Sequence, residues 1–368
     1  MDRIRMHRYT IGMKREQDTD REILARQAWE IWDDKAKPQL SLGRLEQIAV
    51  DIVCMRGELH PKLGRPAMLL FAADHGIVEE KVSSSPQEIT WQQCTNFACG
   101  GGAIALLCRI NGIDLTVIDV GVAHEFPAHV PIVSRKVRNG TRNFAKEPAM
   151  TGQELASAMD SGVRMVRHVH EEGRAVVAFG EMGIGNTTSS SAVMACLTGI
   201  SVERCTGRGA GLSADALAHK KRVIADAISL HGNPDTPEHV LRIFGGYEMA
   251  AITGGMLEAA RRRMVILVDG FIASTAALVA IGIDQRCKDH MLFCHESDEG
   301  GHRILMEHLH VRPILSLSMR LGEGTGAAVG WTIIRQAMAL YEDMTSFDAA
   351  RVTNSVALLK EQGVSFHA

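Results

Sequence analysis

Short apolar runs alternate with helical segments along the middle of this chain, and this alternation constrains the fold more than any other feature. The chain must return after each buried strand, and a covering helix is the usual way back, so the pattern favours a parallel sheet with helices on both faces. We therefore expect an α/β fold with a doubly wound, mostly parallel sheet. The expected strands are 67–73, 114–120, 175–179, 264–268 and 291–294, and the helices between them include 103–111, 153–172, 214–230 and 248–262.

Both ends of the chain have helical patterns and no strand of their own. Residues 20–57 place apolar side chains at helical spacing on one face, and the chain after Thr325 is helical to about Met344, with more helix expected from Phe347. We expect these ends to pack together as a small helical subdomain. Its predicted residues are 1–60 and 335–368, and the α/β domain is predicted to cover 61–334.

Composition excludes several classes of function. A net charge of −3 over 368 residues provides no positive field for nucleic acid or for an anionic membrane. Residues 1–14 carry charges throughout and do not resemble a signal peptide. The longest apolar stretch, 264–283, is interrupted by Asp269-Gly270, so a buried strand followed by a buried helix explains it better than a membrane span. Eight separate cysteines in a long chain favour a reducing, cytoplasmic location.

One group of residues imitates a metal site. Cys287, His290, Cys294 and His295 follow one another closely, but their intervals match no usual zinc spacing. We therefore expect a structural role for them and no metal site.

A single carboxylate lies between two glycines in the segment Gly322-Glu323-Gly324, just before a predicted helix. Glycine on both sides lets the backbone turn sharply and lets a ligand approach closely. A carboxylate held there can serve as a general base. The alternative is a solvated side chain in an ordinary glycine-rich loop.

A second glycine-rich segment, Gly180 to Thr188, connects a predicted strand to a predicted helix. Such a turn leaves backbone N–H groups free to bind an anion, usually a phosphate. Its spacing matches neither the Walker loop nor the dinucleotide fingerprint. The residues predicted to bind phosphate are Gly183, Gly185, Asn186 and Thr187, and the alternative is a tight connection capped by threonine.

A third polar cluster, Asp74-His75, follows the first predicted strand, and Ser85 and Gln93 come shortly after it. Ligands of open α/β sheets bind outside the carboxyl ends of the strands, where these residues should gather. An Asp-His pair alone does not separate an acid/base couple from a metal site or a loop brace, and we interpret it as structural.

These segments together resemble one family. Phe71 to Gly76, Gly180 to Thr188, Val268 to Phe271 and Leu321 to Ala328 match, in order, motifs of the nicotinate-nucleotide–dimethylbenzimidazole phosphoribosyltransferases of cobalamin lower-ligand synthesis. The resemblance extends from about residue 29 to about residue 350. It implies transfer of 5-phosphoribosyl from nicotinate mononucleotide to 5,6-dimethylbenzimidazole or a related base, which gives nicotinate and α-ribazole 5′-phosphate without a cofactor.

The resemblance also implies roles for individual residues. Glu323 matches the catalytic base, and Glu181 matches a second carboxylate of the site, although it could instead brace the turn through backbone N–H groups. Lys220 is a candidate to support the phosphate, with a solvated helix lysine as the alternative. Ser85 and Gln93 match residues of the acceptor pocket, and Ser297 falls in a late matching segment as a substrate-binding candidate.

One departure from the family pattern concerns the acceptor. Some members have a tyrosine just before the proline that is Pro86 here, whereas this chain has Ser83-Ser84-Ser85. Some relatives use phenol or p-cresol and work as pairs of non-identical subunits. A homodimer is the expected assembly, and a heterodimer with a paralogous subunit is the alternative.

Two rival functions compete with this interpretation: a sugar kinase, and a catalytically inactive subunit that only completes the site of a partner. A sugar kinase would need a matched set of carboxylates to bind magnesium, and we find none in this sequence. The retention of Glu323 and Glu181 argues against an inactive subunit.

Overall fold

The computed structural model describes residues 20–209, 211–232 and 234–361. The predictions made for residues 1–14, and for the parts of the helical subdomain before residue 20 and after residue 361, lie outside these residues. The chain divides into two compact units, Leu63–Trp331 and Met1–Lys62 with Thr332–Ala368. Whether 1–60 with 335–368 folds as a domain distinct from 61–334 remains a prediction.

The α/β unit is built on a six-stranded sheet in which every neighbouring pair is parallel, in the order β3-β2-β1-β4-β5-β6. This confirms the doubly wound parallel sheet. The strands are β1 (Ala67–Ala73), β2 (Asp114–Gly121), β3 (Ile132–Ser134), β4 (Val176–Met182), β5 (Val265–Val268) and β6 (Met291–Phe293). A separate two-stranded parallel sheet pairs β7 (His295–Glu296) with β8 (Leu315–Ser316).

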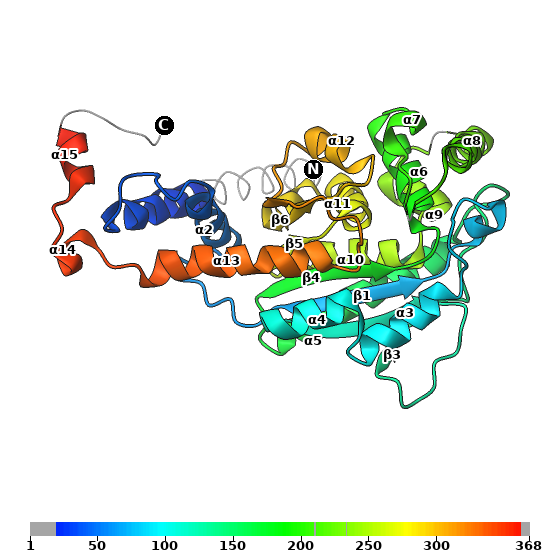
Figure 1. Ribbon diagram of the computed structural model, residues 1–368, viewed down its shortest axis with the longest axis horizontal. Coiled ribbons are helices and arrows are strands. Elements are labelled where there is room, and N and C mark those ends of the chain that lie inside the picture. Colours follow the sequence, from blue (N-terminus) through cyan, green and yellow to red (C-terminus); the bar gives the residue numbers. More distant parts are fainter. Residues whose placement is uncertain (1–19, 210, 233, 362–368) are drawn as a thin grey trace, which may run out of the picture. The chain divides into compact units, whose positions relative to one another are not determined.

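Strands β1 and β4 lie side by side at the centre of the sheet (Figure 1). The chain runs outward from β1 to β3 and then returns to begin the other half at β4. The order therefore reverses between β1 and β4, and open α/β sheets bind ligands beyond the carboxyl ends of their strands at such a point.

The sheet is buried on both faces, which explains why its strands are continuous apolar runs. Successive side chains of a strand point to opposite faces. Leu69 and Phe71 of β1 join a core with residues of the helices on one face, whereas Met68 and Leu70, also buried, point to the other. The helices of this unit are α3 (Ile89–Ala98), α4 (Gly102–Asn111), α5 (Gly152–Glu171), α6 (Asn186–Thr198), α7 (Val202–Cys205), α8 (Ala214–His231), α9 (Pro237–Phe244), α10 (Tyr247–Arg261), α11 (Phe271–Ile283), α12 (His302–Leu309) and the start of α13 (Thr325–Asp343).

The stretch 264–283 forms the buried strand and buried helix expected of it. Strand β5 and helix α11 are separated only by Asp269-Gly270, and nearly all of the stretch is buried in the core. In the part of the chain that the structure describes, no helix has the length and apolar character of a membrane span.

In the helical unit, the prediction of continuous helix over residues 20–57 is wrong. Residues 20–57 are not one helix, because the helix that covers 20–34 ends before α2 (Arg44–Arg56) begins. Between them the Lys35 ammonium donates to the backbone oxygen of Met344 over 2.8 Å, and Lys35 forms an isolated bridge with Ser346. The proline at position 38 lacks the N–H that a helix would need there. In the described part of this unit, α14 (Phe347–Ala350) and α15 (Ser355–Glu361) follow α13.

Candidate functional site

Three buried carboxylates meet at the carboxyl edge of the central strands. Glu181 is on β4 next to its end, Asp269 directly follows β5, and Glu323 precedes α13. The backbone oxygen of Glu323 lies so close to Gly180 of β4 that a Cβ at position 180 would approach it to 2.5 Å. The sequence places these residues far apart, and the parallel sheet brings them together.

Glu323 sits in a strained turn. Gly322, Glu323 and Gly324 have φ angles of +81°, +64° and +90°, and a left-handed conformation costs a residue with a side chain about 1–2 kcal/mol. The Glu323 side chain is 8% exposed, and its Oε2 atom has no hydrogen-bond partner among the described residues. Burial, together with the charge of Asp269, raises the pKa of Glu323 to about 7. A carboxyl with this pKa can accept a proton near neutral pH.

Glu181 braces the same turn. Its Oε1 atom accepts the backbone N–H of Glu323 over 3.2 Å, and its Oε2 atom accepts the side-chain N–H of Asn186. Burial, together with the charges of neighbouring carboxylates, raises the pKa of Glu181 to about 8. Its contacts in the structure are therefore those of the bracing alternative, and they connect the Glu323 turn to the first residue of α6.

The start of α6 and Lys220 form a positively polarised corner. Lys220, on α8, is fully buried, so the solvated-lysine alternative is wrong. Its ammonium donates to the Thr187 hydroxyl, 2.8 Å away, in the first turn of α6. Burial lowers the pKa of Lys220 to about 8. A buried cation at the positive end of a helix dipole is unfavourable unless an anion joins it, and this corner is therefore suited to a phosphate.

Gly185 is required by the backbone as well as by any ligand. It precedes α6 with a φ of +100°, and a Cβ there would lie 2.8 Å from the Val78 side chain. A substitution at this position would therefore disturb the local fold before it reached a phosphate. Gly183 is equally confined, because a Cβ would collide with the backbone oxygen of Ala73.

His75, which follows Asp74, contacts helix α6. The His75 ring contacts the Ser189 hydroxyl through Nδ1 (2.9 Å) and the Glu248 carboxylate through Nε2 (2.7 Å), and all three side chains are fully buried. The Asp74 carboxylate accepts the N–H of Ala123 over 2.8 Å. These contacts are those of a structural support. Sequence reasoning did not find Glu248, which lies 173 residues from His75.

The acceptor-side candidates lie on a different segment. Ser85 is half-buried, and its backbone N–H donates to the Ser83 hydroxyl over 3.1 Å. Gln93 is on α3, where it accepts from the Asn96 side chain over 3.1 Å. Its neighbour Cys94 is buried, and burial raises the pKa of that thiol, as do several carboxylates including Glu323. The Glu323 charge therefore acts on a side chain of helix α3.

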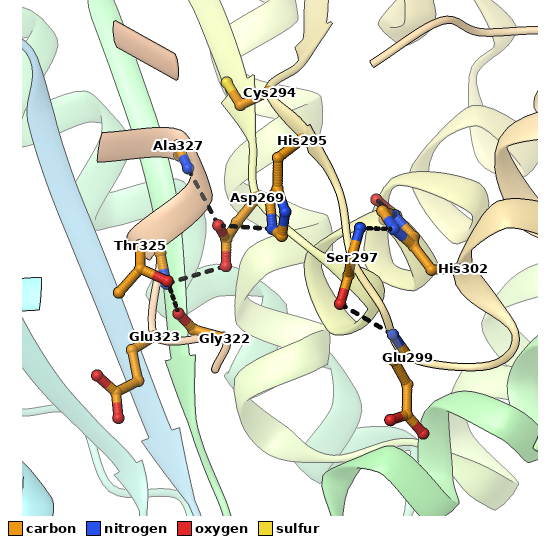
Figure 2. A network of polar contacts seen from close by, with 12 residues as sticks. Asp269, Cys294, His295, Ser297, Glu299, His302, Gly322, Glu323, Thr325 and Ala327 are labelled. Carbon is orange, nitrogen blue, oxygen red and sulfur yellow. Dashed lines mark hydrogen bonds and ion pairs between the residues drawn. The ribbon is translucent and has the colours of Figure 1, made fainter. Parts of the chain in front are cut away.

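Ser297 belongs to a neighbouring network rather than to the Glu323 turn. Its hydroxyl accepts the N–H of Glu299 over 3.3 Å, and its own N–H donates to Nδ1 of His302 over 2.7 Å (Figure 2). Both oxygens of Glu299 lie 3.1 Å from the N–H of Gly209, and the Glu299 charge also acts on Lys220. Ser297 therefore lies in the network that supports the loop on the Lys220 side of the site.

The four residues that imitated a metal site do not form one. The thiols of Cys287 and Cys294 donate to backbone oxygens, those of Met256 and Leu292 respectively. Across the residues described in the structure, no three His, Cys, Asp or Glu side chains are arranged to hold a metal ion.

Asp269 received no individual role from the sequence, and His295 was expected only to be structural. Figure 2 shows the Asp269 carboxylate between the start of α13 and the His295 ring, whose Nε2 is 3.6 Å from Oδ1. The two oxygens of Asp269 accept the N–H groups of Gly324 and Ala327, each over 3.0 Å. The signals in the sequence were the position of Asp269 at the end of an apolar run and its place in the matching segment Val268 to Phe271.

The chain is similar over most of its length to proteins of known family. A family model described as "Phosphoribosyltransferase" matches residues 17–352. Nicotinate-nucleotide–dimethylbenzimidazole phosphoribosyltransferases from Cupriavidus taiwanensis and Pelodictyon phaeoclathratiforme are 44% and 46% identical, over 88% and 87% of this chain and 93% and 91% of theirs.

Solved structures agree with the sequence matches. The enzyme of the same name from Thermus thermophilus superposes with a TM-score of 0.84 at 38% identity, and the match covers 90% of this chain and 98% of that one. A second structure from that organism, entitled CobT, gives a TM-score of 0.86 at 38% identity, over 90% of this chain and 99% of the other. The six-stranded parallel sheet, the buried glutamate turn and these similarities lead to one conclusion: the chain belongs to the nicotinate-nucleotide–dimethylbenzimidazole phosphoribosyltransferase family.

Proposed function

We propose that this enzyme transfers 5-phosphoribosyl from nicotinate mononucleotide to 5,6-dimethylbenzimidazole or a close benzimidazole, in the branch of cobamide synthesis that supplies the lower ligand. The observation that carries the proposal is the pairing, at one sheet edge, of a corner suited to phosphate with a buried carboxyl whose Oε2 has no partner among the described residues. The two features are connected through Glu181 and Asn186.

The donor's phosphate would bind at the start of α6. Gly183, Gly185, Asn186 and Thr187 surround the helix start, and the Lys220 ammonium supplies a positive charge there. A phosphate would accept charge-assisted hydrogen bonds from Lys220 and Thr187. It would also offset the unfavourable burial of a cation at a helix N-terminus.

Glu323 would act as the general base. In the donor the C1–N bond joins ribose to a cationic pyridinium ring, so the bond breaks with its electron pair going to the departing nicotinate nitrogen. One nitrogen of the benzimidazole forms the new bond to C1, and the proton on its other nitrogen passes to the carboxylate of Glu323. The pKa of Glu323, near 7, suits this transfer.

Glu181 would act mainly by holding the Glu323 turn, and its charge, when ionised, would favour the cation that develops at C1. Ser85 and Gln93 would line the acceptor side, and Ser297 the donor side near Lys220. The enzyme would need no cofactor and no metal, because the leaving group is already activated. A cytoplasmic homodimer is the proposed form, and a heterodimer with a paralogous subunit is the alternative.

The test is to incubate the purified chain with nicotinate mononucleotide and an aromatic acceptor, without added metal, and to measure nicotinate and riboside phosphate. We expect activity with 5,6-dimethylbenzimidazole, and about 10²–10⁴-fold lower turnover in Glu323→Gln. Competition between benzimidazole and phenol, with the molar mass measured by light scattering, tests the acceptor and the assembly. Phenol transfer that appears only after a second subunit is added would refute the benzimidazole reading and support the heteromeric one.

A further inference from the structure

The backbone of the Gly322-Glu323-Gly324 turn is held from two neighbouring strands. The N–H of Glu323 donates to Glu181 of β4, and the next N–H, that of Gly324, donates to Asp269 at the end of β5. Two adjacent strands therefore supply the acceptors for two successive N–H groups. The position of the Glu323 side chain depends on both.

Asp269 makes the larger contribution to this arrangement. Its second oxygen accepts the N–H of Ala327 over 3.0 Å, so one carboxylate holds both the turn and the first turn of α13. The side chain is 1% exposed. Both oxygens accept N–H groups, which is the bonding pattern of an ionised carboxylate. An amide in its place would present an N–H₂ group to one of the two N–H donors.

The charge of Asp269 also acts on Glu323. The titratable groups that face Glu323 are Glu181 from β4, Asp269 from the end of β5 and Cys94 from α3. After burial, Asp269 is the cause that raises the pKa of Glu323. A neutral side chain at position 269 should therefore lower that pKa.

We propose that Asp269 is a positioning residue for Glu323: it holds the left-handed Gly322-Glu323-Gly324 turn against the sheet, so that the carboxylate faces the site where the acceptor's proton is removed. This inference rests on the proposed function, because it assigns Asp269 a task only if Glu323 is the base. In this role Asp269 acts on the reaction only through the turn that it holds.

The test is a double-mutant cycle of Asp269→Asn and Glu323→Gln, measured as kcat and KM for nicotinate mononucleotide. Asp269→Asn should lower kcat on the order of 100-fold, because small displacements of a catalytic group have effects of this size, and KM should change little. If Asp269 acts through Glu323, the same substitution should lower kcat no further in the Glu323→Gln background. Equal effects in both backgrounds would overturn the proposal while leaving Glu323 as the base. Near-normal turnover in Glu323→Gln alone would instead remove Glu323, and with it the proposed mechanism.

The pH profile provides a readout that a merely structural role would not produce. The base must be deprotonated, so activity falls as the pH drops through its pKa. Asp269→Asn should move this acidic limb to lower pH, since a negative charge next to Glu323 is lost. A limb that stays in place or moves to higher pH contradicts the proposal.

Asp119→Asn is the matched control. Asp119 is also buried at the carboxyl end of a strand, and it also accepts two backbone N–H groups, those of Gly121 and Val122. We expect Asp119→Asn to lose a comparable amount of thermal stability, but to keep a nearly unchanged kcat and the acidic limb of the pH profile at the same pH.

If Asp269→Asn does not fold, Thr325→Val is the alternative variant. It loosens the same turn by removing the 2.8 Å hydrogen bond from the Thr325 hydroxyl to the backbone oxygen of Gly322. We expect Thr325→Val to lower kcat in the native enzyme but not in the Glu323→Gln variant. An unchanged kcat in the native background overturns the proposal.

Discussion

Replacing the catalytic candidate Glu323 by glutamine should make the protein more stable at alkaline pH while it removes activity. Folding raises the pKa of this carboxyl from the ordinary 4.5 to about 7. The ionised side chain therefore opposes folding, and the stability available below pH 4.5, where the carboxyl is protonated in both states, is lost as the pH rises through 7. At about 1.4 kcal/mol for each pKa unit, the full cost is about 3 kcal/mol. Glutamine has nearly the same shape and does not ionise, so the free energy of unfolding of the variant does not fall with pH for this reason.

The assay is urea unfolding of the native enzyme and of Glu323→Gln at pH 5 and at pH 8. The free energy of unfolding of the variant, minus that of the native enzyme, should be greater at pH 8 than at pH 5 by about 2–3 kcal/mol, because the carboxyl is mostly protonated in the folded state at pH 5. Glu171→Gln, at an exposed position of α5, serves as the control and should change stability by no more than about 0.5 kcal/mol at either pH. A difference that does not grow between pH 5 and pH 8 would refute the claim that burial raises the pKa of Glu323.

Two further predictions concern the donor and the metal. Lys220→Met should raise the KM for nicotinate mononucleotide by about 10–100-fold, because one charge-assisted hydrogen bond contributes about 1.5–3 kcal/mol. Lys221→Met, on the same helix, is the control and should leave this KM unchanged. If steady-state kinetics give the same KM for both variants, the phosphate binds elsewhere. Prolonged dialysis against EDTA should leave the rate unchanged, and activity that is lost and then restored by zinc or magnesium would revive a metal role for the segment from Cys287 to His295.

Much of the fold could be predicted because buried parallel strands leave a strong local signal. The apolar runs at 67–73 and 264–268 correspond to β1 and β5 almost residue for residue. Strand β4 extends to Met182, beyond the predicted end at residue 179, because Glu181 is buried there by neighbours that are remote in sequence. Strands β7 and β8 are only two residues long, which is too short for any period to appear.

The same contrast applies to the site. Glu323 and the glycine-rich start of α6 stand out in the sequence because glycines at a sharp turn mark places where the backbone adopts a conformation that other residues avoid. Lys220 carries no such mark, and its alternative as a solvated side chain was open until the fold buried it completely. Its burial depends on elements that lie far from it along the chain.

The sequence by itself therefore determined the class of fold, the family and the residues whose role depends on their immediate neighbours in the chain. Only the tertiary structure decided which distant groups act on them: Asp269 and Glu181 on the Glu323 turn, and Glu248 on His75. The physical reason is that hydrogen bonds and charges act over a few ångströms of space, whereas these partners are separated by as many as 173 residues of chain. No local pattern records such a contact.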